Sequence, residues 1–119
     1  MGSSYRDLIA WQKAMELVAL IYRITQSFPR DELYGLTSQL RRAAVSIPSN
    51  IAEGQGRKSS NEFRHSLHNA AGSLMEVETQ ITISEMLEYI NPSKASELLA
   101  KCNEVGRIVN GLLNSLTPA

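Results

Sequence analysis

The residues most suited to chemistry lie in the run Glu62-Phe63-Arg64-His65, which is a Glu-x-x-His unit. Di-iron four-helix bundles hold their metals with two such units and two further inward-facing glutamates, and this chain contains one unit. The apolar residues Phe63 and Leu67 define the inward face of this helix, which places the glutamate and the histidine to its side. We therefore expect a helix-start glutamate and a solvated histidine, with no metal and no cofactor.

No nucleophile is set up for catalysis. The single cysteine, Cys102, falls at an apolar position of its helix and is expected to be a small core residue. Residues 54–59 are similar to a phosphate-binding loop, but they lack a preceding strand and a glycine directly before the lysine. An anion could still bind beside Arg57 and Lys58, where the free amide groups of the next helix begin. We therefore expect a protein that is not an enzyme.

The chain has 12 basic and 12 acidic residues and zero net charge, but the charges are unevenly distributed. Residues 35–68 hold five basic and two acidic residues, a balance of +3, whereas residues 69–90 hold four glutamates and no Lys or Arg. A strongly basic domain predicts nucleic-acid binding, and here the positive excess is local. The candidate nucleic-acid contacts are the basic residues of the positive segment, Arg41, Arg42, Arg57, Lys58 and Arg64.

Arg41 and Arg42 are adjacent, so on a helix they point about 100° apart. One interpretation is that at least one of them pairs with an acidic group of the following helix, such as Glu76 or Glu78. The other is that they contact a nucleic acid.

Four stretches have the spacing of three and four residues that is typical of amphipathic helices. The predicted helices cover about residues 7–27, 32–53, 60–89 and 92–116. The connectors between them are short, and no stretch alternates like a strand. The sequence therefore predicts an all-α fold, an antiparallel up-down-up-down four-helix bundle.

Pro48 lies inside an apolar stripe that runs from Leu33 to Ile51 without a break. Proline removes one backbone hydrogen bond, and its ring presses on the carbonyl four residues earlier, so we predict a kink. Because the stripe continues on the same face, we expect one bent helix and not two. Asp31 is expected to cap the start of this helix, and Gly54 to end it in the left-handed conformation.

The third predicted helix has recognisable signals at both ends. Ser59 with Glu62 predicts a capping box at its start, and Asn91 followed by Pro92 predicts a new helix after it. Gly72 within the helix costs about 1 kcal/mol relative to alanine, which predicts close packing against a neighbouring helix.

The first predicted helix carries two apolar stripes, more than one bundle core requires. The first consists of Leu8, Trp11, Met15, Val18 and Tyr22, and the second of Leu17, Ile21, Ile24 and Phe28. One interpretation places Trp11 and the second stripe in the core of the monomer. The other has one of the stripes packing against another subunit, since broad exposed apolar patches usually mark interfaces.

A chain of 119 residues is expected to form one domain, 1–119, with residues 1–5 as a disordered tail. A single cysteine cannot form an internal disulfide, which favours a reducing compartment. The sequence contains no run of 18 apolar residues and no signal-peptide pattern at its start. We therefore expect a cytoplasmic protein that does not contact a membrane.

Several strings carry a family resemblance. They are Trp11-Gln12-Lys13-Ala14, Tyr34-Gly35-Leu36, Gln39-Leu40-Arg41-Arg42-Ala43, Ser46-Ile47-Pro48-Ser49-Asn50-Ile51-Ala52-Glu53-Gly54, Arg57, Glu62-Phe63 and Ala71-Gly72-Ser73-Leu74. The chain resembles, over roughly residues 5–90, the bacterial-type four-helix-bundle family first known from intervening sequences in large-subunit ribosomal RNA genes. That family includes the accessory variability determinant protein of diversity-generating retroelements.

The resemblance implies a homo-oligomer of five subunits, and for most members it implies no established activity. The accessory variability determinant protein is strongly basic and binds nucleic acid and a reverse transcriptase, so RNA, DNA and a reverse transcriptase are the implied partners. This chain departs from it in being neutral. We expect a non-enzymatic, pentameric scaffold or adaptor that contacts RNA or DNA through a local basic patch. The alternatives are a protein-interaction module without nucleic-acid affinity and, third, a metal- or ligand-binding bundle.

Overall fold

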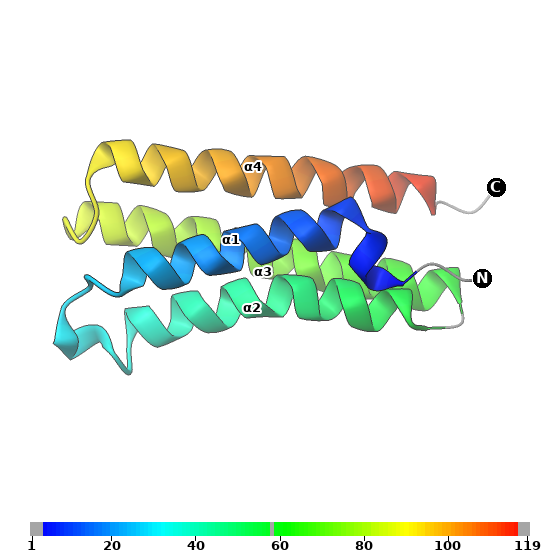
Figure 1. The fold of residues 1–119 in the computed structure, drawn as a ribbon, viewed down its shortest axis with the longest axis horizontal. Helices are drawn as coiled ribbons and strands as arrows, with labels where there is room; N and C mark the ends of the chain where they lie inside the picture. The colour runs from blue at the N-terminus through cyan, green and yellow to red at the C-terminus, as the bar shows by residue number, and fades with distance from the viewer. Residues whose placement is uncertain (1–3, 58, 117–119) are drawn as a thin grey trace.

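The computed structural model describes residues 4–57 and 59–116. Its elements are, in chain order, η1 (Tyr5–Asp7), α1 (Ile9–Thr25), η2 (Arg30–Glu32), α2 (Leu36–Gln55), α3 (Ser60–Met86) and α4 (Pro92–Ser115) (Figure 1). The two η elements are short 3-10 turns, and α1 to α4 correspond to the four predicted helices. The predicted all-α fold is confirmed.

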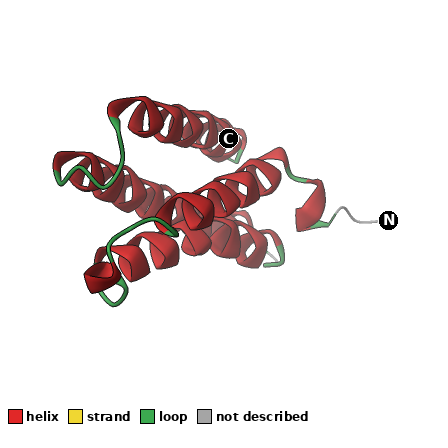
Figure 2. Ribbon diagram, turned by 60° about the vertical axis from the view of Figure 1, so that its left-hand side comes forward, coloured by secondary structure: helices red, strands yellow, loops and turns green. Residues whose placement is uncertain are grey.

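Consecutive helices are joined at alternate ends of an elongated bundle, so neighbours in sequence run antiparallel (Figure 1). α2 packs against α1 and α3, and α4 packs against α3 and α1, whereas the described residues of diagonally opposite helices make no close backbone approach. A second view shows the helices joined by short loops, with no strand in the part that is drawn (Figure 2). The bundle measures 47 × 22 × 21 Å.

The core takes one apolar stripe from each helix. Its largest fully buried side chains are Leu17, Ile21, Leu40, Ile47, Ile51, Leu67, Val77, Ile81, Leu98, Cys102, Val105 and Val109. Each fully buried aliphatic side chain stabilises the fold by about 2 kcal/mol relative to an exposed one. On α1 the second predicted stripe supplies the fully buried side chains, whereas Leu8, Trp11 and Val18 of the first stripe pack against the edge of the core and stay partly exposed.

α2 runs without interruption through Pro48, whose side chain is buried. The prediction of one helix and not two is confirmed, and the size of the bend stays a prediction. Next to the proline, the Asn50 side-chain amide donates to the Ser46 carbonyl at 2.8 Å and to the Ser46 hydroxyl at 3.0 Å. The Ser46 hydroxyl also lies 2.8 Å from the Ser73 hydroxyl, so this part of α2 is tied to α3.

The start of α2 differs from the prediction. The helix begins at Leu36, four residues later than expected, and Asp31 lies in the 3-10 turn η2. Glu32 takes the capping role, because its Oε1 accepts a hydrogen bond from the Leu36 backbone N–H at 2.9 Å. Its Oε2 accepts from the Tyr89 hydroxyl at 2.8 Å. One carboxylate therefore caps α2 and ties it to the segment between α3 and α4.

The predicted role of Gly54 as a left-handed cap is wrong. α2 continues to Gln55, and no described glycine has a positive φ. A Cβ atom at Gly54 would lie 2.5 Å from the Ser66 Cβ and 3.0 Å from the Phe63 Cδ1. Glycine is required here because α2 and α3 approach each other closely.

The remaining helix ends agree more closely with the sequence. Ser59 caps α3 by accepting from the Glu62 N–H at 3.1 Å, and Asn91 caps α4 by accepting from the Lys94 N–H at 2.7 Å. α4 begins at Pro92, as predicted. α1 and α3 are each shorter than predicted.

Two further expectations need correction. Ser4 and Tyr5, placed in a disordered tail, form part of a capped 3-10 turn, while residues 1–3 lie outside the described residues. Gly72 is exposed, and a Cβ added to it would meet nothing within 4 Å, so the predicted close packing does not occur there within the chain. Among the described residues, no helix has the length and apolar character needed to cross a membrane.

Candidate functional surfaces

Arg41 is engaged within the monomer. Its Nε donates to the Thr25 hydroxyl at 2.8 Å, and its guanidinium lies 4.6 Å from the centroid of the Tyr22 ring. The Thr25 hydroxyl in turn donates to the Ile21 carbonyl at 2.8 Å. Arg41 also donates from Nη2 to the Tyr22 carbonyl at 3.5 Å, so it connects α2 to α1 through a hydroxyl, a ring and a backbone carbonyl. The expected acidic partner on α3 is not used.

Arg42 points away from Arg41 and lies exposed along an open groove between α2 and α3. Glu76 and Gln80 line the same groove, but Arg42 forms no ion pair within the described part of the chain. The interpretation that an arginine of this pair bridges to Glu76 or Glu78 is therefore wrong. Arg42 remains available to a partner.

The other candidate basic residues do not gather around Arg42. Arg57 is exposed at the far end of α2, about 22 Å away along the helix axis, and lies 3.9 Å from Glu53. Arg64 is half-buried on α3, and its Nε has no hydrogen-bond partner among the described residues. Lys58 lies outside the described residues. Arg41, Arg42 and Arg57 therefore do not form one patch.

The Glu-x-x-His unit faces solvent. Glu62, His65 and His68 are all exposed on α3, and Phe63 turns partly toward the core as expected. Among the described residues, no three His, Cys, Asp or Glu side chains are grouped so that they could hold a metal ion.

Cys102 is fully buried on α4. Burial, with a smaller contribution from the negative charge of Glu78, raises the pKa of its thiol to about 12. A thiol with this pKa is almost entirely protonated at neutral pH, and the protonated form is a poor nucleophile. Cys102 is therefore a core residue.

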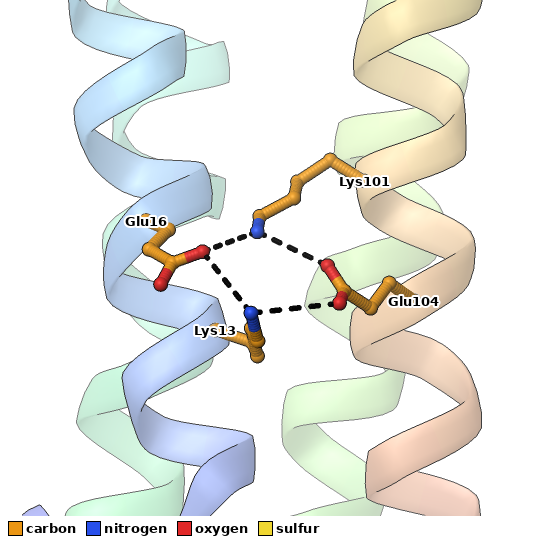
Figure 3. A network of polar contacts seen from close by, with 4 residues as sticks. All are labelled: Lys13, Glu16, Lys101 and Glu104. Carbon is orange, nitrogen blue, oxygen red and sulfur yellow. Dashed lines mark hydrogen bonds and ion pairs between the residues drawn. The ribbon is translucent and has the colours of Figure 1, made fainter.

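Four charged side chains cross the outer side of the α1–α4 interface (Figure 3). Lys101 contacts Glu16 and lies 3.0 Å from Glu104, while Lys13 lies 3.6 Å from each of these glutamates. The hydrogen bond from Lys101 lowers the pKa of both carboxyl groups, and the hydrogen bond to Glu16 raises the pKa of Lys101. All four side chains are partly exposed, so the network sets the register of α1 on α4 more than it adds stability.

The first apolar stripe of α1 is only partly covered. Met15 and Tyr22 are 42% and 41% exposed, and Trp11 and Val18 are half-buried. Across the α1–α2 contact, Val45 of α2 is 40% exposed. We call these five residues, Trp11, Met15, Val18, Tyr22 and Val45, the α1–α2 apolar face.

Two arginines border this face. Arg41 lies over Tyr22, and the Arg6 guanidinium lies 5.8 Å from the Trp11 ring centroid. Neither arginine forms an ion pair within the described residues. The border of the face is therefore positively charged. The two apolar stripes of α1 indicated in the sequence that part of this helix could be uncovered. The sequence pattern gave no indication that Thr25 is the partner of Arg41.

Comparison with known proteins agrees with this fold. The model of the 23S rRNA-intervening sequence protein family matches residues 6–111. No curated protein matches the chain. A solved structure from the S23 ribosomal protein family of Bacteroides thetaiotaomicron VPI-5482, a protein with unknown function, is similar with a TM-score of 0.79 and 19% identity. The similarity covers 88% of this chain and 98% of that one, and at this identity it shows the fold alone. Because the family model spans most of its residues, the chain belongs to the 23S rRNA-intervening sequence protein family.

Proposed function

We propose that the protein is a non-enzymatic scaffold or adaptor that assembles with copies of itself, and that the α1–α2 apolar face is a surface through which the copies meet. The observation that carries this proposal is the exposure of Met15 and Tyr22 on α1 and of Val45 on α2, one helical turn after the Arg41 that contacts Tyr22. Contiguous exposed apolar residues rimmed by polar ones are typical of interaction sites.

The composition of this face suits a protein partner. Aromatic residues, methionine and arginine are the types enriched in interfaces, and Trp11, Tyr22, Met15, Arg6 and Arg41 supply all of them. Both arginines already lie over aromatic rings, so little side-chain freedom remains to be lost when a partner binds. A subunit number of five is the expectation that comes with the family resemblance.

The absence of enzymatic activity is part of this proposal. It is supported by the burial of Cys102 and by the positions of His65 and His68, which lie exposed on one helix and pair with no acidic side chain in the part of the chain that the structure describes. Activation of a nucleophile or a general base requires such a partner.

The test is a solution mass. Met15→Glu would place a charge at the centre of the α1–α2 apolar face, and we expect it to reduce the assembly to a monomer. Ile9→Glu is the matched control, because Ile9 is 55% exposed on the same helix but lies outside the face. An Ile9→Glu protein that falls apart equally would show that charge alone, and not this face, controls assembly.

RNA or DNA is a second candidate partner, and the observation that favours it is the unpaired, exposed Arg42. Arg57 has one weak ion pair and could add a second phosphate contact. Contacts of this kind position a nucleic-acid backbone without reading bases, so we expect low sequence preference and a steep loss of affinity with salt. Five copies in a ring would repeat these weak contacts and strengthen them.

This candidate is tested by binding of the assembled protein to a mixed RNA and DNA pool at low salt. Changing Arg42 and Arg57 to alanine should weaken binding, while Arg23→Ala, an exposed arginine on α1, should not. Equal binding by all three proteins would refute a role for Arg42 and Arg57. If the parent binds neither nucleic acid, the protein-interaction alternative takes the lead.

A further inference from the structure

α3 has a second face that the monomer leaves uncovered. On the side of α3 opposite its buried stripe, exposed uncharged side chains recur at helical spacing. We call these residues the α3 outer face: Gly72, Met75, Thr79, Thr82, Ile83 and Met86. All of them are exposed, with Met75 and Met86 at 67% and 76%. Solvent-exposed helix faces normally carry several charged residues, and over four turns this one has only Glu76, which lies exposed at its margin beside Gly72 and Ile83.

The hydroxyl groups of this face are turned away from solvent. Thr79 donates to the Met75 carbonyl and Thr82 to the Glu78 carbonyl, each at 2.9 Å on the preceding turn. With the hydroxyls bonded to their own helix, the methyl groups remain as the outward parts of the two threonines. The α3 outer face is therefore more apolar than its composition suggests.

Gly72 has no role inside the chain. It has open space around it, and its φ is not positive, so alanine would fit and would favour the helix by about 1 kcal/mol. A glycine on an exposed apolar helix face lets another backbone approach closely. This feature fits a surface that is covered by a partner.

We propose that the α3 outer face of one copy receives the α1–α2 apolar face of the next copy. This inference rests on the proposed self-assembly and identifies the surface on the other side of the contact. Charge selects this pairing. Glu76 and Glu78 border the α3 outer face, and neither forms an ion pair in the described ranges. Arg42 of α2 lines the groove beside Glu76 and Arg107 of α4 the groove beside Glu78, but residues 69–90 carry four glutamates and no Lys or Arg, so the border that α3 itself supplies is acidic. The α1–α2 apolar face is bordered by Arg6 and Arg41.

The alternative pairings place like charges together. Two α1–α2 apolar faces would bring arginines against arginines, and two α3 outer faces would bring glutamates against glutamates. Joining unlike faces brings each arginine border against an acidic one, which favours the correct partner and disfavours the others. A contact between two different faces of the same chain repeats from copy to copy and closes into a ring when the rotation allows.

The α3 outer face runs from Gly72 to Met86, about 21 Å along the helix axis and a little under half of the 47 Å length of the bundle. A contact of about 800 Å² per partner, the size typical of stable interfaces, would therefore also include neighbouring side chains of α2 and α4.

The test uses two variants that each damage one face. Met15→Glu places a negative charge opposite the acidic border of the partner, and Met75→Lys places a positive charge opposite the arginine border. Each variant alone should be monomeric, with unchanged helical circular dichroism because both side chains are exposed. Mixed in equal amounts, they should form particles of at least twice the 13.2 kDa chain mass, because one intact copy of each face remains and the two altered faces carry opposite charges.

The other outcomes separate this inference from the proposed function. A Met75→Lys protein that assembles like the parent would overturn the role of the α3 outer face and leave self-assembly standing. Two monomeric variants that stay monomeric when mixed would show that the faces do not bind each other. A Met15→Glu protein that assembles like the parent would refute a role for the α1–α2 apolar face in assembly, and would therefore also refute its pairing with the α3 outer face. A monomeric parent would overturn both proposals.

Gly72→Ala supplies a second measurement with a built-in control. Gly111 on α4 is also exposed in open space, so Gly111→Ala should raise the melting temperature of the chain by a similar amount. Only Gly72→Ala should also weaken assembly, by about tenfold in dissociation constant, because its methyl group keeps the next copy at a distance. Equal assembly by the two alanine variants would contradict close contact at Gly72.

Discussion

Gly54→Ala provides a sharp test of how α2 and α3 fit together. Alanine favours a helix over glycine by up to about 1 kcal/mol, so a site with free space would be stabilised. Here the new methyl carbon would lie 2.5 Å from the Ser66 Cβ and 2.9 Å from its Oγ. Real contacts of this kind require about 1 Å more, so the two helices must move apart at Ser66, and the Phe63 ring, whose Cδ1 would lie at 3.0 Å, must shift as well.

Overpacking of this kind costs about 1–3 kcal/mol, which outweighs the gain in helix propensity. We expect Gly54→Ala to lower the free energy of unfolding by about 1–2 kcal/mol and the melting temperature by about 4–8 °C. Urea unfolding followed by circular dichroism measures the difference. Gly56→Ala is the control, because its added methyl carbon would meet nothing closer than 3.6 Å.

A double variant distinguishes the overlap from other causes. Ser66→Gly removes the Cβ that the new methyl group strikes, so Gly54→Ala should cost less in a Ser66→Gly background than in the parent. If Gly54→Ala is as stable as the parent, or if its cost is the same in both backgrounds, the close approach of α2 to α3 at this site is not what requires glycine.

Three further outcomes follow from polar and buried groups. Tyr89→Phe should lower the melting temperature at pH 7, because it removes a hydrogen bond to the Glu32 carboxylate. Hydrogen bonds from the Leu36 N–H and from Tyr89 lower the pKa of Glu32 in the folded protein. The difference in melting temperature from the parent should therefore be complete above the ordinary glutamate pKa and disappear as pH falls through the lowered pKa of Glu32. The Cys102 thiol, with its pKa of about 12, should react with a thiol reagent at pH 8 more than about a thousandfold slower than a free cysteine, and urea should remove the protection. Lys101→Met should reduce the salt dependence of stability, because the parent loses the screened contact between Lys101 and Glu16 as salt rises.

The sequence predicted the helices and the core because burial imposes a regular spacing on apolar residues. The second stripe of α1 and the start of α4 at Pro92 followed from that spacing and from capping chemistry. The two ends of α2 could not be predicted in this way. Glu32 reaches ahead to cap α2, and Gly54 serves close packing, and in both cases the deciding contact comes from the three-dimensional arrangement. A glycine near a helix end has the same sequence signature in either role.

The candidate surfaces were predictable only in part. The double stripe of α1 indicated an uncovered apolar face, but the basic residues between 41 and 64 gave no indication that Arg41 is taken by Thr25. The α3 outer face was not predicted from the sequence, because threonine counts as a polar residue. Only the structure shows that the hydroxyls of Thr79 and Thr82 are bonded to the preceding turn. The signal available in the sequence was the recurrence of uncharged residues at helical spacing from Gly72 to Met86.

The most direct test of the proposed self-assembly is the mass of the native protein at micromolar concentration, measured by light scattering or native mass spectrometry. We expect a discrete multiple of the 13.2 kDa chain, with five copies as the number that the family resemblance implies, and the loss of this mass in Met15→Glu but not in Ile9→Glu. A parent protein that has the mass of a single chain at this concentration would contradict self-assembly.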